Sequence, residues 1–257
     1  VLQAGVALAP ASGFEGDTLL LGGNFEDPGS DVHTLQISWG DGSPLQTITL
    51  PLGARTFSIP HTFVDNASQI NLWLKDDDSL TISSGATLNV TIGNRNPQPQ
   101  IAGPSTGVEG TAIQLSASAV DSGLLDTQAY NWTVSQNGVP VFAGVGSLFS
   151  FVPVDQGTYQ VQLTAMDDDG GSGTSSSSIV VANVAPTIDI DGTPLSVIEG
   201  VPFEFQGSFT DPGSEDSHQV AIDWGDGSPV TLLDLPRGVT AFYSPHTYVD
   251  DNPTGTV

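Results

Sequence analysis

The stretch that decides the fold is Ile37-Ser-Trp-Gly-Asp-Gly-Ser-Pro44, which returns almost unchanged as Ile222-Asp-Trp-Gly-Asp-Gly-Ser-Pro229. A strand that ends in tryptophan and runs into Gly-Asp-Gly is typical of a β-hairpin, because Asp-Gly readily adopts the positive φ angles of a tight turn. The large tryptophan ring is expected in a hydrophobic core. The return of the whole motif predicts a protein built from repeats.

The sequence on either side of this motif repeats as well. Phe25-Glu-Asp-Pro-Gly-Ser and Phe209-Thr-Asp-Pro-Gly-Ser precede the two copies, and His61-Thr-Phe and His246-Thr-Tyr follow them. A degraded middle copy keeps the Glu-Gly step, the tryptophan and the Asp-Asp-Asp segment, which begins at Asp76 in the first copy and at Asp167 in the second. The Glu-Gly step and the tryptophan occur in all three copies, at Glu15, Glu109, Glu199, Trp39, Trp132 and Trp224. The period of about 90 residues matches the size of a small β-sandwich.

Short segments of alternating apolar and polar residues are separated by clusters of Gly, Pro, Asn, Asp and Ser, which predicts antiparallel strands. We therefore predict an all-β chain of tandem immunoglobulin-like β-sandwiches, with modules at 1–93, 94–182 and 183–257. Residues 94–99 form the linker that opens the second module. By the repeat spacing, the Asp-Asp-Asp segment of the third module would fall beyond Val257, so this module is expected to be incomplete and to lack its last strands.

The charge balance excludes several classes of function. The chain has 4 basic and 29 acidic residues, a formal net charge of -25, so binding to nucleic-acid phosphates through a basic patch is not expected. Such an excess of negative charge repels itself unless cations or salt neutralise it. There is no cysteine for disulfides or thiolate metal sites, and no apolar run is long enough to predict insertion into a membrane.

Taken in order, Glu-Gly, Asp-Pro-Gly-Ser, Trp-Gly-Asp-Gly-Ser, His-Thr-Phe/Tyr and Asp-Asp-Asp-Gly resemble tandem polycystic-kidney-disease (PKD) domains of the bacterial extracellular type. The resemblance covers essentially the whole chain and is weaker in the middle module, where Trp132-Thr-Val replaces the signature. It implies immunoglobulin-like sandwiches that serve as spacers, adhesive modules or binding modules on cell surfaces and in secreted hydrolases. It implies no catalysis, and we expect no catalytic residue.

The same resemblance implies calcium where a linker enters a module, held by a linker Asn, an Asp in the loop after the second strand and an Asp late in the module. The matching positions are Asn94, Asp121, Asp167, Asp168 and Asp169 for the second module, Asp27 and Asp77 for the first, and Asn183 and Asp211 for the third. Calcium prefers such oxygen ligands. In the third module the site is expected to be weak or empty, because its late carboxylate would lie beyond Val257. The alternative is that these aspartates only form turns.

Three other patterns have weaker functional interpretations. The Glu-Gly glutamates are additional candidates for ligands at a module junction. The pairs His33 with His61 and His218 with His246 resemble half of a zinc site but lack a third ligand at fixed spacing. Trp73 lies between two leucines of an alternating strand and is the one aromatic residue suspected of a surface contact.

We therefore expect a non-catalytic extracellular or cell-surface stalk or adhesion segment whose module junctions are stiffened by calcium. An extracellular protein or glycan is its expected partner. The alternative is an accessory glycan- or protein-binding module of a secreted hydrolase, for which an exposed Trp73 with aromatic neighbours would be the supporting feature.

Overall fold

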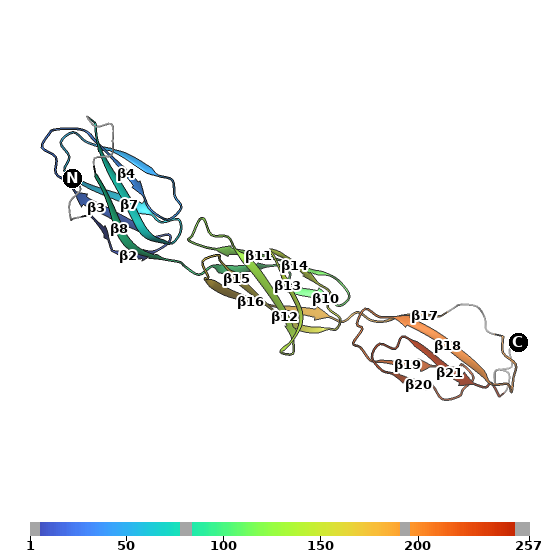
Figure 1. The fold of residues 1–257 in the computed structure, drawn as a ribbon. Coiled ribbons are helices and arrows are strands. Elements are labelled where there is room, and N and C mark those ends of the chain that lie inside the picture. The colour runs from blue at the N-terminus through green and yellow to red at the C-terminus, as the bar shows by residue number, and fades with distance from the viewer. Residues whose placement is uncertain (1–5, 78–83, 191–195, 250–257) are drawn as a thin grey trace.

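The computed structural model describes residues 6–77, 84–190 and 196–249. Within these ranges the chain forms twenty-one β-strands and no helix, which confirms the all-β prediction. Figure 1 shows the strands gathered into three groups that follow one another in an extended row. We call these groups modules one, two and three. No helix in the described part of the chain has the length and apolar character needed to cross a membrane.

Module one contains two sheets that face each other across a core. Its eight strands are β1 (Ala7–Ala9), β2 (Ser12–Phe14), β3 (Thr18–Asn24), β4 (His33–Ser38), β5 (Gln46–Leu50), β6 (Thr56–Thr62), β7 (Ala67–Asp76) and β8 (Ser84–Gly93). The sheet orders are β1-β3-β6 and β2-β8-β7-β4-β5. All neighbouring pairs are antiparallel except β2 and β8, which run parallel.

Module two repeats this arrangement. Its strands are β9 (Gln98–Ala102), β10 (Thr106–Val108), β11 (Ile113–Val120), β12 (Ala129–Gln136), β13 (Val139–Val145), β14 (Leu148–Phe151), β15 (Gly157–Met166) and β16 (Ser172–Ala182). The sheets are β10-β16-β15-β12-β13 and β14-β11-β9. The short strand β10 pairs in parallel with the last strand β16, as β2 does with β8. This parallel pair recurs at the end of the module where the chain leaves it.

Module three shows five strands among the described residues. They are β17 (Thr187–Asp189), β18 (Phe203–Thr210), β19 (His218–Ile222), β20 (Thr231–Leu235) and β21 (Ala241–His246), in sheets β17-β18-β21 and β19-β20. Within the described ranges β19 pairs with β20 alone, whereas its counterpart β4 pairs with both β5 and β7. The extreme ends of modules one and three, residues 1–5 and 250–257, lie outside the described residues.

The three equivalent tryptophans lie in the cores, as predicted. Trp39 and Trp132 are each 1% exposed, and Trp224 is 9% exposed. Along β7 the burial alternates, so that Leu72 and Leu74 face the core while Trp73 between them is half-buried on the other face. The residues beside Trp73 in the neighbouring strands are Gln36 and Gly85, so no aromatic side chain stands directly across from it.

The Trp-Gly-Asp-Gly motif forms a seven-residue loop between β4 and β5, which corrects the predicted tight turn. The two glycines adopt the positive φ angles, 80° at Gly40 and 77° at Gly42, and Asp41 does not. The Asp41 carboxylate instead organises the loop: Oδ1 accepts from the Ser43 N–H (3.1 Å), and Oδ2 accepts from the Val64 N–H (3.1 Å) and bonds His61 Nε2 (2.7 Å). Burial alone would raise the pKa of Asp41, but these hydrogen bonds hold it well below its ordinary value.

The His61 ring also stacks on Trp39, with ring centroids 4.0 Å apart and planes 3° apart. His246 repeats the pattern, stacked on Trp224 at 4.2 Å and bonded to Asp226 at 3.0 Å. Module two has no histidine here, and Phe149 stacks on Trp132 in its place at 5.6 Å. The loop and this histidine therefore form one structural cluster in modules one and three.

We expect Asp41→Ala to destabilise module one, because His61, Ser43 and Val64 lose a buried acceptor together. The loss should be about 2–3 kcal/mol, since a buried group left without its partner bears its full desolvation cost. Hydrogen–deuterium exchange of β4 and β6 should then speed up by roughly 30-fold or more. Asp226→Ala is the matched variant and should have a smaller effect on module three, because Asp226 lies at a more exposed site. Equal exchange in Asp41→Ala and wild type would contradict this role.

Candidate metal centre

The Glu-Gly step lies at the point where the chain leaves module one and, at its second copy, module two. Because β2 runs parallel to β8, both strands end at the same edge, and the Glu15 N–H donates to the carbonyl of Gly93 (3.0 Å). The Glu15 side chain is fully buried, and its Oε1 accepts from the N–H of Arg95 (2.5 Å) in the linker. Glu15 therefore connects the last residue of module one to the linker by two hydrogen bonds.

The second junction, between modules two and three, has the same arrangement. The Glu109 N–H donates to the carbonyl of Ala182 (3.1 Å), and Glu109 Oε1 accepts from the N–H of Val184 (2.6 Å). Glu109 is 1% exposed. In module three Glu199 is exposed, and the described residues include no strand equivalent to β8 or β16 beside it.

Carboxylates from both modules converge on the first junction. Oxygen atoms of Glu15, Asp65 and Asp126 lie within 4.8 Å of one another, and so do those of Asp121, Asp126 and Asp167. Asp65 comes from the loop between β6 and β7 of module one, and Asp126 from the loop between β11 and β12 of module two. Asp126 belongs to both sets and connects them.

Burial and neighbouring negative charges raise the pKa values of Glu15, Asp65 and Asp126. Burial, followed by the negative charges of Glu15 and Asp121, raises the pKa of Asp126 to about 7. Burial is also the main cause that raises the pKa of Glu15 and of Asp65, and Asp169 adds to the shift at Asp65. Carboxylates so placed favour either a bound proton or a nearby cation.

The structure brings together three of the five residues predicted for the second module. The Asn94 amide donates to Asp167 Oδ2 (3.0 Å), and Asp121 and Asp167 share the set with Asp126. Asp168 is exposed and accepts from the Thr127 N–H (2.9 Å), outside this set. Asp169 is exposed and lies near Asp65 of module one.

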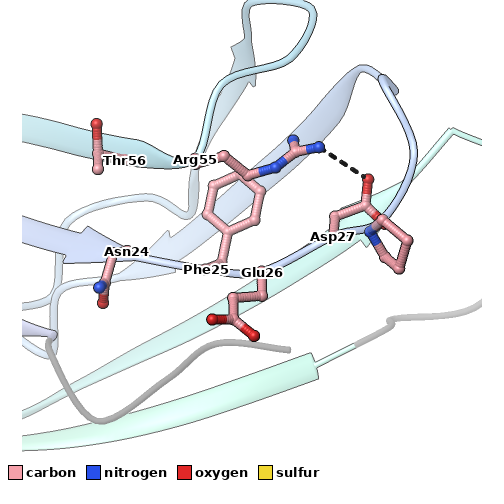
Figure 2. Close-up of a pocket in the computed structure, with 7 residues that line it drawn as sticks. Asn24, Phe25, Glu26, Asp27, Arg55 and Thr56 are labelled. Atoms are coloured by element: carbon pink, nitrogen blue, oxygen red, sulfur yellow. Dashed lines mark ion pairs between the residues drawn. The ribbon is translucent and has the colours of Figure 1, made fainter.

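In module one the predicted Asp27 forms a set of converging carboxylates with Asp31 and Asp76. The predicted Asp77 is exposed; burial is the main cause that raises the pKa of Asp31, and Asp77 is one of the nearby charges that add to the shift. Asp27 also lines a surface pocket with Asn24, Phe25, Glu26, Pro28, Arg55 and Thr56. Figure 2 shows the Arg55 guanidinium directed at Asp27, at an N–O distance of 3.6 Å. Because this guanidinium is paired within the protein, the pocket offers less attraction to an anionic ligand.

In module three the predicted Asp211 forms a set with Asp216 and His218, and His218 Nε2 bonds Asp211 Oδ2 at 2.9 Å. The predicted Asn183 lies at the second junction. With its amide nitrogen turned inward it donates to Asp216 Oδ2 (3.1 Å), Gln156 Oε1 (2.7 Å) and Glu109 Oε1 (2.9 Å). Glu109, Asp155 and Asp216 form a further set of converging oxygens.

The histidine pairs do not converge on a common point. His61 bonds Asp41, whereas His33 lies 3.6 Å from Asp27 and packs against Phe25. The two histidines of module one therefore pair with different aspartates and do not form a shared zinc site.

Sequence reasoning missed the junction carboxylates Asp65 and Asp126, and their counterparts Asp155 and Asp216. Each pair recurs at an interval of 90 residues, close to the repeat period, and this spacing is the signal by which they are recognisable. The glutamates of the Glu-Gly step were considered only as weak candidates. Two of the three are the most buried carboxylates of the junctions.

The glycine of the Glu-Gly step allows the next module to approach closely at the two junctions. Gly16 and Gly110 have φ angles of 80° and 73°, and an added Cβ would lie 2.8 Å from Ser122 Cβ and 2.3 Å from Pro212 Cβ respectively. Gly200 has a similar φ of 72°, but an added Cβ would meet nothing within 4 Å. A side chain at any of the three positions would be strained by the positive φ, and at Gly16 and Gly110 it would also clash with the next module.

We expect Gly110→Ala to weaken the contact between modules two and three, because the added Cβ would clash with Pro212. Gly200→Ala should cause only the backbone strain of a positive φ, which both variants have. The amide of Val184, which donates to Glu109, should exchange with deuterium about tenfold faster or more in Gly110→Ala, equivalent to ~1.4 kcal/mol. Equal exchange at Val184 in the two variants would show that the close approach to Pro212 is unimportant.

We also expect the pH dependence of the first junction to follow Asp126. Its folded pKa of about 7 lies above its ordinary value of 3.8, so the folded state prefers the protonated form. In metal-free buffer this contribution is complete below about pH 4 and is lost as the pH rises through about 7. The thermal midpoint of the wild type should therefore decrease as the pH is raised from 5 to 8. The thermal midpoint of Asp126→Asn should decrease less over the same range. Parallel profiles for the two proteins would contradict the assignment.

Comparison with known proteins gives the family of the middle module. A sequence model of the PKD domain matches residues 94–181, and no curated protein sequence matches the chain. Among solved structures, the PKD domain of an M14-like peptidase from Thermoplasmatales archaeon SCGC AB-540-F20 is 21% identical with a TM-score of 0.29, over 35% of this chain and 98% of that one.

Two longer structures are also similar. A tetra-tandem repeat from the extending region of a large adhesion protein is 15% identical with a TM-score of 0.48, over 97% of this chain and 66% of that one. The FN1–FN3 domains of chicken CNTN1 are 11% identical with a TM-score of 0.32, over 95% and 88%. The family match confirms the predicted resemblance for the middle module: residues 94–181 form a PKD domain, within a tandem array of immunoglobulin-like β-sandwiches.

Proposed function

We propose that this chain is a non-catalytic, extracellular stalk or adhesion segment whose module junctions are stiffened by calcium. The observation that carries this proposal is the convergence of Asn94, Asp121 and Asp167 where the linker enters module two. These residues belong to three separate segments of the chain, and they present amide and carboxylate oxygens, the ligands that calcium prefers.

The surroundings of this linker site suit a cation. Asp167 is 7% exposed, and its Oδ1 accepts from the N–H groups of Asp169 (3.1 Å) and Gly171 (2.6 Å), which fix the carboxylate. The amide oxygen of Asn94 is buried without a hydrogen-bond partner. A surface pocket lined in part by Asn94, Asn96 and Asp121 leads to the site.

A stalk function agrees with the architecture. The modules follow one another in an extended row, and short linkers with direct contacts join them. An ion that ties linker to module would restrict bending at each junction. The match to a PKD domain supports an extracellular location, because such domains typically serve as non-catalytic modules there. An extracellular protein or glycan is the proposed partner.

An accessory glycan-binding module of a secreted hydrolase is the second candidate. The half-buried Trp73 is the observation in its favour, since an exposed indole face can stack on a sugar ring. Its direct neighbours across the sheet, Gln36 and Gly85, do not extend an aromatic platform. The stalk proposal therefore has the stronger support.

A thermal melt with calcium or with chelator, at equal ionic strength and neutral pH, tests the proposal. If the linker site binds at ~0.1–1 mM, about 10 mM calcium stabilises the module by at least about 1.4 kcal/mol, which raises its midpoint by roughly 6–11 °C. Asp167→Asn should lose most of this shift. Asp234→Asn, which removes one exposed charge from β20, should keep it. An equal rise with magnesium, or no rise at all, would contradict a calcium-specific site.

A further inference from the structure

The first junction contains buried oxygen atoms that the linker site does not use. Glu15 Oε2 is buried without a hydrogen-bond partner, although Oε1 of the same carboxylate accepts from the linker. Both carboxylate oxygens of Asp126 are also buried and without a partner. With Asp65 these side chains bring their oxygens within 4.8 Å of one another. Buried carboxylate oxygens normally have partners, so this arrangement requires an explanation.

The second junction repeats the arrangement independently. Glu109 Oε2 and Asp155 Oδ1 are buried without partners, and they converge with Asp216. The side-chain amide of Asn183 lies among Glu109, Gln156 and Asp216, with contacts of 2.7 to 3.1 Å. Turned one way the amide donates to these oxygens, and turned the other way it adds its own oxygen to them. With the Asn183 amide oxygen turned inward, the cluster consists of oxygen atoms alone, and a hard cation prefers oxygen ligands.

No basic side chain in the described ranges neutralises the first cluster. Arg95 lies beside Glu15, but its guanidinium donates to the carbonyl of Glu15 (3.0 Å) and to Asp17 Oδ1 (2.7 Å). The carboxylate of Glu15 receives only the backbone N–H of Arg95. The two modules therefore approach each other with like charges, and a cation between them would turn this repulsion into attraction.

We propose that each junction holds a further calcium ion that bridges two modules, bound by Glu15, Asp65 and Asp126 at the first junction and by Glu109, Asp155 and Asp216 at the second. This bridging site differs from the linker site of Asn94, Asp121 and Asp167 because two of its three carboxylates come from the preceding module. Asp126 lies between the two sites and can give one oxygen to each. The inference rests on the proposed function only in that calcium is the ion at both sites.

The bridging site would control the orientation of neighbouring modules. The linker site orders the chain where it enters module two. The bridging site also connects the loop between β6 and β7 of module one to module two. Asp65 and Asp155 hold equivalent positions in successive repeats, and the structure places both at the boundary to the next module. The effect should therefore occur at both junctions.

Equilibrium dialysis of the full 257-residue chain against calcium tests the proposal by stoichiometry. Asp65→Asn and Asp155→Asn should each bind one calcium ion fewer than wild type, and the double variant two fewer. Asp167→Asn should also lose one ion, but from the linker site. Asp234→Asn, the exposed-charge control, should bind as wild type does. Circular dichroism of each variant establishes that it is folded, and Asp155→Asn decides the question by itself if Asp65→Asn unfolds.

The outcomes separate the two proposals. Unchanged stoichiometry in Asp65→Asn and Asp155→Asn, together with a loss in Asp167→Asn, would overturn the bridging site and leave the linker site standing. A loss in Asp65→Asn and Asp155→Asn with none in Asp167→Asn would support the bridging site and overturn the linker site. Absence of calcium binding by wild type would overturn both.

A second readout is the distance between modules, measured with one spin label on β5 and one on β13. Calcium should narrow this distance distribution in wild type and in Asp234→Asn. It should leave the distribution broad in Asp65→Asn, even though that variant keeps its linker site. Equal narrowing in Asp65→Asn and wild type would overturn the bridging role.

Discussion

The buried glutamate at each exit from a module is the contact on which the junctions depend. Glu15 and Glu109 each join the end of a final strand to the linker through one backbone N–H and one carboxylate oxygen. Their position follows from the parallel pairing of a short early strand with the last strand, β2 with β8 and β10 with β16. The sandwich topology thus places a carboxylate where the chain leaves the module.

This placement has an electrostatic consequence for the neighbouring module. In the next sandwich, the loop between β11 and β12 carries Asp126 and the loop between β18 and β19 carries Asp216, and these aspartates meet the buried glutamates. A chain with a net charge of -25 has few internal cations to offset such crowding. Burial is the main cause that raises the pKa of Asp126 and of Asp216, and neighbouring carboxylates add to both shifts. Linker and bridging cations, as proposed, would let the same carboxylates fix the modules in one orientation.

The core tryptophan is covered in two different ways in the three modules. In modules one and three an aspartate in the loop holds a histidine flat against the core tryptophan, and in module two a phenylalanine covers the tryptophan without a charged partner. Either solution buries the indole, so the sandwich tolerates loss of the Gly-Asp-Gly loop. Only the junction carboxylates depend on a neighbouring module.

The sequence by itself determined the repeats, the strands and the buried tryptophans, because alternation and repeat spacing are properties of local sequence. It also indicated Asn94, Asp121 and Asp167 through the resemblance to PKD domains. It did not distinguish Asp65 and Asp126 from the many turn-forming aspartates, since their convergence requires two modules to meet. Glu15, Glu109 and Glu199 share one local sequence, yet the first two are buried and the third is exposed. Only the tertiary structure decided this difference, because burial depends on what packs against a side chain.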